Sequence, residues 1–437
     1  MKNITINALI AAAGFVGAQA YAACPDQTDA AGKMNNKPLC VVSGNYKQDL
    51  VLTSDNIYVL SGGVFIGGDN KSNATLTIQP GTTVVGQSGA DYLVITRGSK
   101  IMAEGTKEQP IVFTSARQTD RSRGLWGGLI INGNAPINNC ANASAVCEAE
   151  GEGNSGLYGG DDAFDSSGVL KYVRVEFAGY EITPDNELNG IAFQGVGSGT
   201  VVDYIQVHMN ADDGIEFFGG NVNAKHVLLT GNKDDSLDWT NGWTGMMQYV
   251  IVKQFDDAAN HGIEADNLSS PQNAEPRSNP TIANMTLLGT TSSAAKGGSG
   301  MLLRRGTGGA FYNTVIKGFK SSCINIDDAE TFNNGASLNG AQLEAKGLTM
   351  VSSVVDCSSS FSVDADDVWN TGDWFTAQSG NKAADAGLNG WVPVEGSVLL
   401  SGGQTPFDLF FDEVDYIGAV KDAESDWTVG WTISATK

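Results

Sequence analysis

Basic side chains are scarce in this chain. It has 26 lysines and arginines and 3 histidines against 49 aspartates and glutamates, which gives a net charge of −23 at pH 7. Nucleic-acid binding needs basic grooves, so this charge balance excludes it. The balance also disfavours anionic lipid, and an acidic polysaccharide would be repelled unless calcium bridged the two. The acidity itself is typical of a secreted protein that stays soluble through its charge.

Long apolar runs are missing after the first residues. No segment beyond residue 22 is apolar for about 18 residues, so we expect no transmembrane segment. Residues 1–22 are different, because Lys2 precedes an apolar stretch from Ala8 to Ala18 and Ala20-Tyr21-Ala22 offers small residues for signal cleavage. The sequence therefore predicts an export signal over 1–22. Cys24 raises the alternative of a lipoprotein, which Tyr21 disfavours.

Zinc-type cysteine spacing is also missing. No CxxC and no cysteine–histidine pattern of a zinc site occurs. Export permits disulfides, and six cysteines allow many connectivities. Proximity in the sequence favours Cys24–Cys40, Cys140–Cys147 and Cys323–Cys357. We expect these disulfides to staple the two ends of the fold and one loop.

Helical heptads are missing, and a different repeat takes their place. Asp212-Asp213, Asp234-Asp235 and Asp256-Asp257 follow one another at intervals of 22 residues, each after a short run rich in β-branched residues. A repeat of this length indicates stacked structural units. Short Val/Ile/Leu runs separated by Gly, Asn and Asp indicate an all-β chain. Together they predict a parallel β-solenoid with one coil per repeat.

The rhythm of the apolar runs suggests four parts. We predict a signal peptide at 1–22, an N-terminal cap at 23–55, a parallel β-helix at 56–365 and a C-terminal cap at 366–437. Caps are expected because a solenoid must cover its terminal coils. Two stretches, 138–168 and 268–280, interrupt the rhythm and are predicted to be loop insertions. The tryptophans of the tail are expected to plug the open end of the last coil.

Three strings resemble a known superfamily. They are Ile101-Met-Ala-Glu-Gly-Thr followed by Pro110-Ile-Val-Phe-Thr-Ser-Ala, Gly124-Leu-Trp-Gly-Gly-Leu-Ile-Ile-Asn-Gly-Asn-Ala-Pro-Ile, and Asp415-Tyr-Ile-Gly-Ala-Val with Trp427-Thr-Val-Gly-Trp-Thr. The stretch from Asn56 to Val363 resembles the right-handed parallel β-helix of the pectate-lyase-like superfamily, in particular its secreted or surface bacterial members. The resemblance implies the fold but no reaction, because the architecture carries lyases, hydrolases, adhesins and inert surface proteins.

The acidic repeat is the main candidate site. Carboxylates at one height on successive coils lie about 5 Å apart and raise each other's pKa. Calcium relieves this repulsion by accepting six to eight oxygen ligands. The predicted metal ligands are Asp212, Asp213, Asp234, Asp235, Asp256 and Asp257, with Glu216 and Asp238 as outer members. The alternative is that these aspartates are turn residues that hydrogen-bond nearby backbone.

The resemblance also implies two enzymatic alternatives. Polygalacturonase-type hydrolases use aspartates on successive coils near a Gly-His-Gly string, for which Asp234-Asp235 and His261-Gly262 could stand. The match departs from that pattern, because Asn260 precedes the histidine and no Arg-x-Lys clamp follows. A calcium-dependent lyase would need a basic residue, for which Arg304-Arg305 is the candidate pair. The alternative, which we favour, is that each arginine forms a salt bridge with the acidic face. The three histidines, His208, His226 and His261, are otherwise expected to serve packing or turns.

The leading interpretation is an exported, non-catalytic surface or extracellular protein with a structural or adhesive role and calcium as its candidate cofactor. Its partner would be a surface polysaccharide or another surface protein, and its location secreted or associated with the cell surface or outer membrane. The alternative is a polysaccharide-active enzyme, either a calcium-dependent lyase or a glycoside hydrolase with paired aspartates. An enzyme should show a cleft where the paired acids meet a basic residue, whereas a scaffold should show aspartates bonded to turns.

Overall fold

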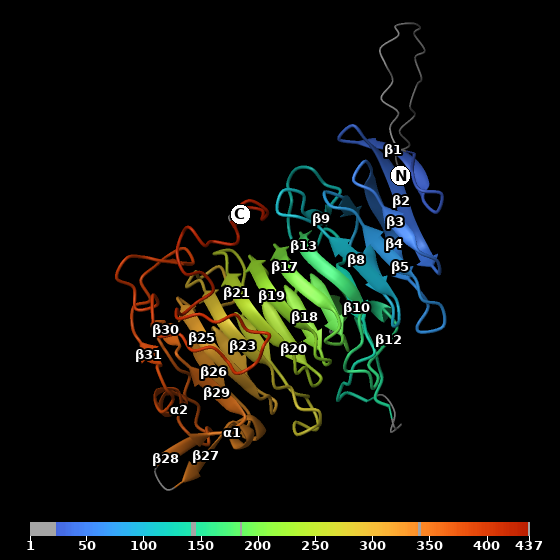
Figure 1. Cartoon of the computed structure of the whole chain (residues 1–437). Coiled ribbons are helices and arrows are strands. Elements are labelled where there is room, and N and C mark those ends of the chain that lie inside the picture. Colours follow the sequence, from blue (N-terminus) through green and yellow to red (C-terminus); the bar gives the residue numbers. More distant parts are fainter. Residues whose placement is uncertain (1–22, 141–145, 184–185, 340–341, 436–437) are drawn as a thin grey trace, which may run out of the picture.

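The computed structural model describes residues 23–140, 146–183, 186–339 and 342–435. The predicted signal peptide, 1–22, lies outside them. Within this part of the chain, 25 strands form one continuous sheet that coils on itself as a parallel β-helix (Figure 1). The prediction of an all-β solenoid is therefore confirmed.

Each full coil contributes strands to three faces. Face 1 contains β3 (Leu50–Leu52), β5 (Thr75–Ile78), β8 (Lys100–Glu104), the first halves of β13 (Gly168–Glu176), β17 (Val201–His208), β19 (Asn223–Thr230), β21 (Met246–Lys253), β23 (Thr281–Leu288) and β25 (Gly309–Lys317), and β29 (Leu348–Val351). Face 2 contains the first halves of β2 (Lys37–Tyr46) and β4 (Ile57–Ile66), β6 (Thr83–Gly86), β9 (Ile111–Ser115), the second halves of β13 to β25, β30 (Val354–Asp356) and β31 (Lys382–Ala383). Face 3 contains the second halves of β2 and β4, β7 (Tyr92–Ile95), β10 (Leu129–Asn132), β16 (Ile191–Gln194), β18 (Ile215–Phe218), β20 (Leu237–Thr240), β22 (Ile263–Ala265), β24 (Met301–Leu303) and β26 (Ile324–Ile326).

The remaining elements lie outside the coils. They are β1 (Asp29–Met34), the hairpins β11 (Ala149–Glu150) with β12 (Leu157–Tyr158), β14 (Tyr180–Thr183) with β15 (Asn186–Leu188), β27 (Ala336–Asn339) with β28 (Gln342–Ala345) and β32 (Leu388–Asn389) with β33 (Val392–Pro393), and the helices η1 (Glu152–Asn154), α1 (Ala329–Gly335) and α2 (Thr371–Thr376). The parallel sheet begins before residue 56, because β2 and β3 already pair with β4 and β5 inside the predicted N-terminal cap.

In the six coils from β13 to β25, one left-handed residue turns the chain from face 1 to face 2. We call this row the corner ladder; it consists of Tyr172, Tyr204, His226, Tyr249, Asn284 and Asn313, all with φ between 49° and 62°. An aromatic residue in this conformation is strained. Stacking offsets the strain, because the ring of Tyr204 lies 4.3 Å from that of Tyr172 and 4.2 Å from that of His226.

The interior is a column of stacked apolar side chains. On face 3 the ring of Phe217 lies 5.2 Å from Phe193 and 4.1 Å from Trp243, and both contacts are nearly parallel. At the end of the column, Trp374 of α2 is buried and donates its indole N–H to the carbonyl of Leu348 at 3.1 Å. This tryptophan closes the last coil.

The three disulfides are the pairs that sequence proximity favours. Cys24–Cys40 joins the first residues to β2, Cys140–Cys147 closes the insertion over face 3, and Cys323–Cys357 ties two of the last coils together. The structure describes no free cysteine.

The tail beyond β31 returns along the solenoid. In Figure 1 the red C-terminal segment runs from the last coils back toward β9 and β13. Consistent with this path, Arg174 of β13 donates a hydrogen bond of 2.8 Å to the carbonyl of Trp431. The tail thus covers the side of the solenoid as well as its end.

The stacked column leads to a stability prediction. Phe217→Ala should lower the free energy of unfolding by about 3–5 kcal/mol, because it leaves a cavity between two stacked rings. The control is Phe164→Ala, whose side chain is 83% exposed and should change stability by less than about 0.5 kcal/mol. Urea denaturation followed by fluorescence measures both, and equal effects would contradict this account of the core.

Candidate metal centre

Three acidic side chains stand next to one another on the outside of face 3. Parallel pairing sets Glu216 of β18 beside Asp238 of β20, and Asp238 beside Glu264 of β22. Side chains alternate along a strand, and the flanking residues of each are core residues such as Phe217 and Trp239. The three carboxylates therefore point outward in one row.

Two turn aspartates join this row from the corner that precedes face 3. Carboxylate oxygens of Asp213, Glu216 and Asp238 lie within 4.8 Å of one another, and so do those of Asp235, Asp238 and Glu264. We call these groups trio A and trio B; they share Asp238. The five residues together are the carboxylate cluster.

The turn aspartates also hold the coils together. Oδ1 of Asp213 accepts the backbone N–H of Asp235 at 2.9 Å, and Oδ1 of Asp235 accepts the N–H of His261 at 2.5 Å. Each carboxylate thus bonds the backbone of the next coil rather than its own turn. One oxygen of each aspartate is engaged in this way, and the cluster is built around the same carboxyl groups.

Burial and mutual repulsion act on the cluster together. Burial first, and neighbouring carboxylates second, raise the pKa of Asp213, Glu216, Asp235 and Asp238 well above the ordinary range. Asp238 is only 8% exposed, and its side chain makes no hydrogen bond or ion pair with a described residue. The centre of the cluster is therefore a buried carboxylate that the charge of Arg304 reaches only at longer range, without a direct contact among those residues.

The two trios differ in their positive neighbours. Arg304 bonds to Glu264 of trio B, and its Nε lies 2.9 Å from Asp266. Trio A has no such ion pair within the described chain. Its one side-chain donor there is the amide of Asn189, which reaches Glu216 at 2.7 Å. Arginine thus compensates trio B, whereas trio A keeps its negative charge or its protons.

Two further acidic side chains with raised pKa values lie near trio A, beneath the insertion that Cys140–Cys147 closes. Asn189 also donates to Glu152, and burial, with Asp212 and Glu187 nearby, raises the pKa of Glu152 to about 8. Burial, followed by the charges of Glu187 and Asp234, raises the pKa of Asp212 to about 7. Asp212 thus borders the cluster, and Asp234 lies 3.7 Å from the amine of Lys296.

The third acidic pair lies elsewhere. Asp256 accepts a hydrogen bond from the hydroxyl of Thr290 at 2.5 Å, and Asp257 forms an ion pair of 2.7 Å with Arg123. The reason is an insertion: nine residues separate the paired strand ends Lys253 and Ile263, against six in the preceding coil. His261 therefore stands at the height of Asp235, and the equal sequence spacing does not mean equal position.

Glu264 completes the site, although the sequence does not single it out as a ligand. The sequence pattern of β22 could have identified Glu264. It follows the core residue Ile263 just as Asp238 follows Leu237 in the preceding coil. The sequence offers Arg304 as a lyase base or as an ion-pair partner of the acidic face, and its contacts with Glu264 and Asp266 are those of an ion-pair partner. Its hydrogen bonds and the charges of Asp266 and Glu264 raise its pKa, although burial opposes them.

The histidines have packing and hydrogen-bonding roles. His208 lies edge-on to Phe177 and Phe255, and burial lowers its pKa to about 4. Burial also lowers the pKa of His261 to about 4, and its Nδ1 accepts the N–H of Ser299 at 3.0 Å. His226 belongs to the corner ladder and lies 2.8 Å from Asp203.

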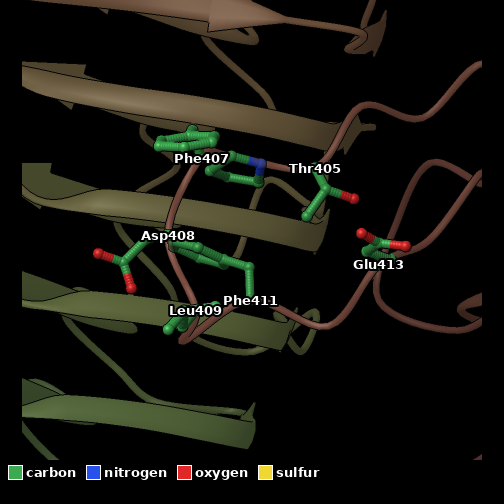
Figure 2. Close-up of a pocket in the computed structure, with 7 residues that line it drawn as sticks. Thr405, Phe407, Asp408, Leu409, Phe411 and Glu413 are labelled. Atoms are coloured by element: carbon green, nitrogen blue, oxygen red, sulfur yellow. The ribbon is translucent and has the colours of Figure 1, made fainter.

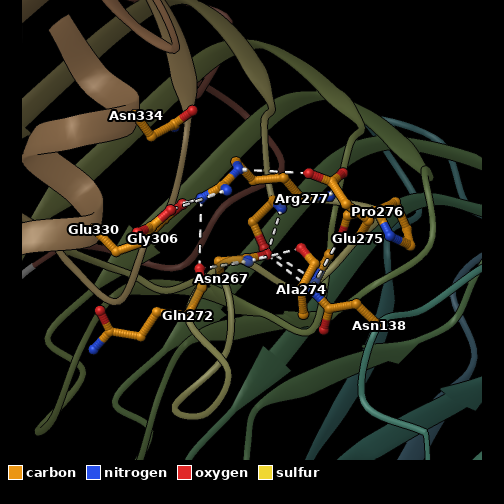
Figure 3. Close-up of polar contacts among 12 residues, drawn as sticks. Asn138, Asn267, Gln272, Ala274, Glu275, Pro276, Arg277, Gly306, Glu330 and Asn334 are labelled. Atoms are coloured by element: carbon orange, nitrogen blue, oxygen red, sulfur yellow. Dashed lines mark hydrogen bonds and ion pairs between the residues drawn. The ribbon is translucent and has the colours of Figure 1, made fainter.

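Two pockets are found away from the cluster. One, of about 510 Å³, is lined by residues of the turn 405–413 in the tail (Figure 2). The other, of about 390 Å³, lies beside the second insertion, where Arg277 bonds the carbonyl of Gly306 and faces Glu275 and Glu330 (Figure 3). Neither pocket includes a carboxylate of the cluster.

Comparison with known families agrees with this architecture. The profile of the pectate-lyase like beta helix domain matches residues 44–432. The chain belongs to this family. No curated protein matches the chain. Membership in the pectate-lyase like family makes it a polysaccharide-related or surface protein, and the family name alone does not decide between catalysis and binding. Among the described residues, no helix has the length and apolar character that crossing a bilayer requires.

The raised pKa values predict an unusual pH dependence. Between pH 4.5 and about 8 the folded chain keeps protons on Glu152 and Asp212 that the unfolded chain releases, so stability falls as pH rises. The melting temperature of chelator-treated protein should therefore fall across this range. Glu152→Gln should flatten the fall near pH 7–8, and the exposed control Glu150→Gln should not. A melting temperature that rises with pH would contradict the assignment.

Proposed function

We propose that this chain is an exported, non-catalytic surface or extracellular β-helix protein that holds Ca²⁺ at trio A. The observation that carries the proposal is the trio itself: the oxygens of Asp213, Glu216 and Asp238 lie within 4.8 Å of one another, and Asp238 is buried with no direct hydrogen bond or ion pair to a described residue. The role of the ion is structural: it replaces protons as the compensating charge between neighbouring coils. The calcium-stabilised face then serves a structural or adhesive role.

The donor chemistry supports a hard cation. Three carboxylates offer up to six oxygens, and calcium takes six to eight oxygen ligands from carboxylates, carbonyls and water. Neither trio contains histidine or cysteine, the ligands that zinc prefers. Trio B is the weaker candidate, because Arg304 already contacts Glu264.

The fixed positions of the charged groups support a non-catalytic role. Asp213 and Asp235 each accept a backbone N–H of the next coil, so one oxygen of each holds neighbouring coils together. Arg304, the candidate base of a lyase, is held as a cation by Glu264 and Asp266, and a protonated guanidinium cannot accept a proton.

One observation favours the enzymatic alternative. A buried carboxyl group with a raised pKa, such as Asp238, can act as a general acid in glycoside cleavage. A polysaccharide-active protein would release reducing ends or unsaturated products from uronate polymers.

The assay incubates the protein with a panel of such polymers, with and without calcium. If neither product is released, the result supports the binding role.

Export and partners follow from the same features. The predicted signal peptide and the three disulfides support an oxidising destination, either secreted or at the cell surface or outer membrane. The partner would be a surface polysaccharide or another surface protein. Calcium on the acidic face would allow an acidic polysaccharide to approach a chain of net charge −23.

Calcium should raise the melting temperature of the mature protein, and EDTA should lower it. A ligand at 100 times its Kd stabilises the folded state by about 2.7 kcal/mol. Asp238→Asn should remove most of this calcium-dependent shift. The matched control, Asp256→Asn, lies in the same sequence repeat but outside the cluster and should keep it. Differential scanning calorimetry with elemental analysis provides the measurement. The metal site would be refuted if the protein contained no calcium and its melting temperature changed neither with added calcium nor with EDTA.

A further inference from the structure

The returning tail is held by side-chain amides of the solenoid. Each of three amides bonds both the N–H and the C=O of one tail residue, as a neighbouring strand would. The pairs are Asn313 with Gln404 at 2.8 and 3.0 Å, Gln248 with Asp412 at 2.8 and 3.0 Å, and Gln206 with Ile433 at 2.8 and 3.1 Å. We call these contacts the amide clamps. They lie at or beside the corner ladder, on three different coils.

Further main-chain contacts lie between the clamps. The amide of Asn284 donates to the carbonyls of Tyr416 and Gly418 at 3.3 and 3.1 Å, and the hydroxyl of Thr286 accepts the N–H of Ala419 at 2.9 Å. With few exceptions, the solenoid thus recognises the tail through its peptide groups. Recognition through peptide groups depends little on the side chains of the bound segment.

Apolar contacts accompany these hydrogen bonds. Trp431 is buried against the corner ladder, with its ring 5.6 Å from Tyr172 and 6.0 Å from Tyr204. Outward-facing residues of face 2, such as Leu228 and Ile251, are fully buried beneath Ala419 and Val420. Without the tail this strip would expose apolar surface, and the clamp amides would bond to water instead of to the tail.

The stretch that leads into this docked segment is exposed. Val394, Glu395 and Gly396 form an outward turn, and Leu400 is 37% exposed. The turn 405–411 lies between two clamps, and there Phe407 and Leu409 project fully into solvent (Figure 2). Leu399, just after the exposed turn, is fully buried and packs with Ile417 of the docked segment. The turn at 394–396 is therefore a place where the chain can be cut while the contacts on both sides of the cut remain.

We propose that the corner ladder and the amide clamps form a binding surface for the tail, and that the tail of a second copy of this chain can occupy it. Residues 404–433 of a second copy fit because they carry the same peptide groups, the same tryptophans and the same apolar residues as the segment that occupies this surface within one chain. Exchange of an identical element between copies is a low-cost route to dimers. The proposal is independent of the calcium site.

The first test cuts the connection and leaves the rest of the chain intact. A protease site inserted between Glu395 and Gly396 allows cleavage of the folded full-length protein. The released fragment should remain bound on size exclusion, and a labelled synthetic peptide of residues 396–437 should exchange with it. Dissociation of the fragment on cleavage, or failure of the peptide to exchange, would overturn the proposal.

The clamp residues provide the matched variants. Gln248→Ala should speed exchange of the labelled peptide by about tenfold, because two hydrogen bonds to the tail are lost. Gln254→Ala is the control, since Gln254 is equally buried but bonds Asn260 and Thr290 inside the solenoid. It should leave the exchange rate unchanged, and equal acceleration by both variants would contradict specific clamping.

The second test addresses the second copy. Two differently tagged full-length proteins are mixed at high concentration, warmed below the melting temperature and cooled. Light scattering should detect a dimer that carries both tags, and dimer formation should disappear when the tail of each chain is cross-linked to its own solenoid by cysteines at 248 and 412. A sample that stays monomeric would overturn exchange between copies.

Discussion

Stacking in register is the constraint on which this structure depends. Parallel coils place equivalent residues about 4.8 Å apart, so that each side chain meets the corresponding side chain of the next coil. The consequence depends on chemistry. Aromatic residues stack at the corner, as Tyr204 does on His226. Apolar residues form a continuous core column. Carboxylates at equivalent positions repel one another, so acidic rows need a compensating charge.

In the carboxylate cluster on face 3, the repulsion between neighbouring carboxylates is relieved differently at the two ends of the row. At Glu264 the protein supplies its own cation, Arg304. At Glu216 it supplies only the amide of Asn189, and the insertion buries this end of the row. Protons or a divalent cation must balance the remaining charge, and the ion that we propose is calcium, which would use oxygen ligands that the row already contains. Stacking in register also explains how the tail binds. The corner ladder repeats from coil to coil, and together with the amides beside it forms a continuous surface along which the tail lies.

The sequence predicts much of the fold because the fold is local and periodic. Apolar runs at regular spacing indicate the coils, and neighbouring cysteines pair as their proximity suggests. The site is less predictable, because a three-residue insertion before β22 moves Asp256 and Asp257 out of the row and brings Glu264 into it. The path of the tail could not be predicted, since its contacts join residues as distant as Gln206 and Ile433, and no periodic signal links them.

The most direct test of the central claim is a crystal structure of the mature protein grown with calcium, with anomalous data collected at long wavelength. The account predicts a calcium peak about 2.3–2.6 Å from carboxylate oxygens of Asp213, Glu216 and Asp238, and none beside Arg304. A trio A that shows no anomalous peak, with its carboxyl groups sharing protons or binding only water, would contradict it.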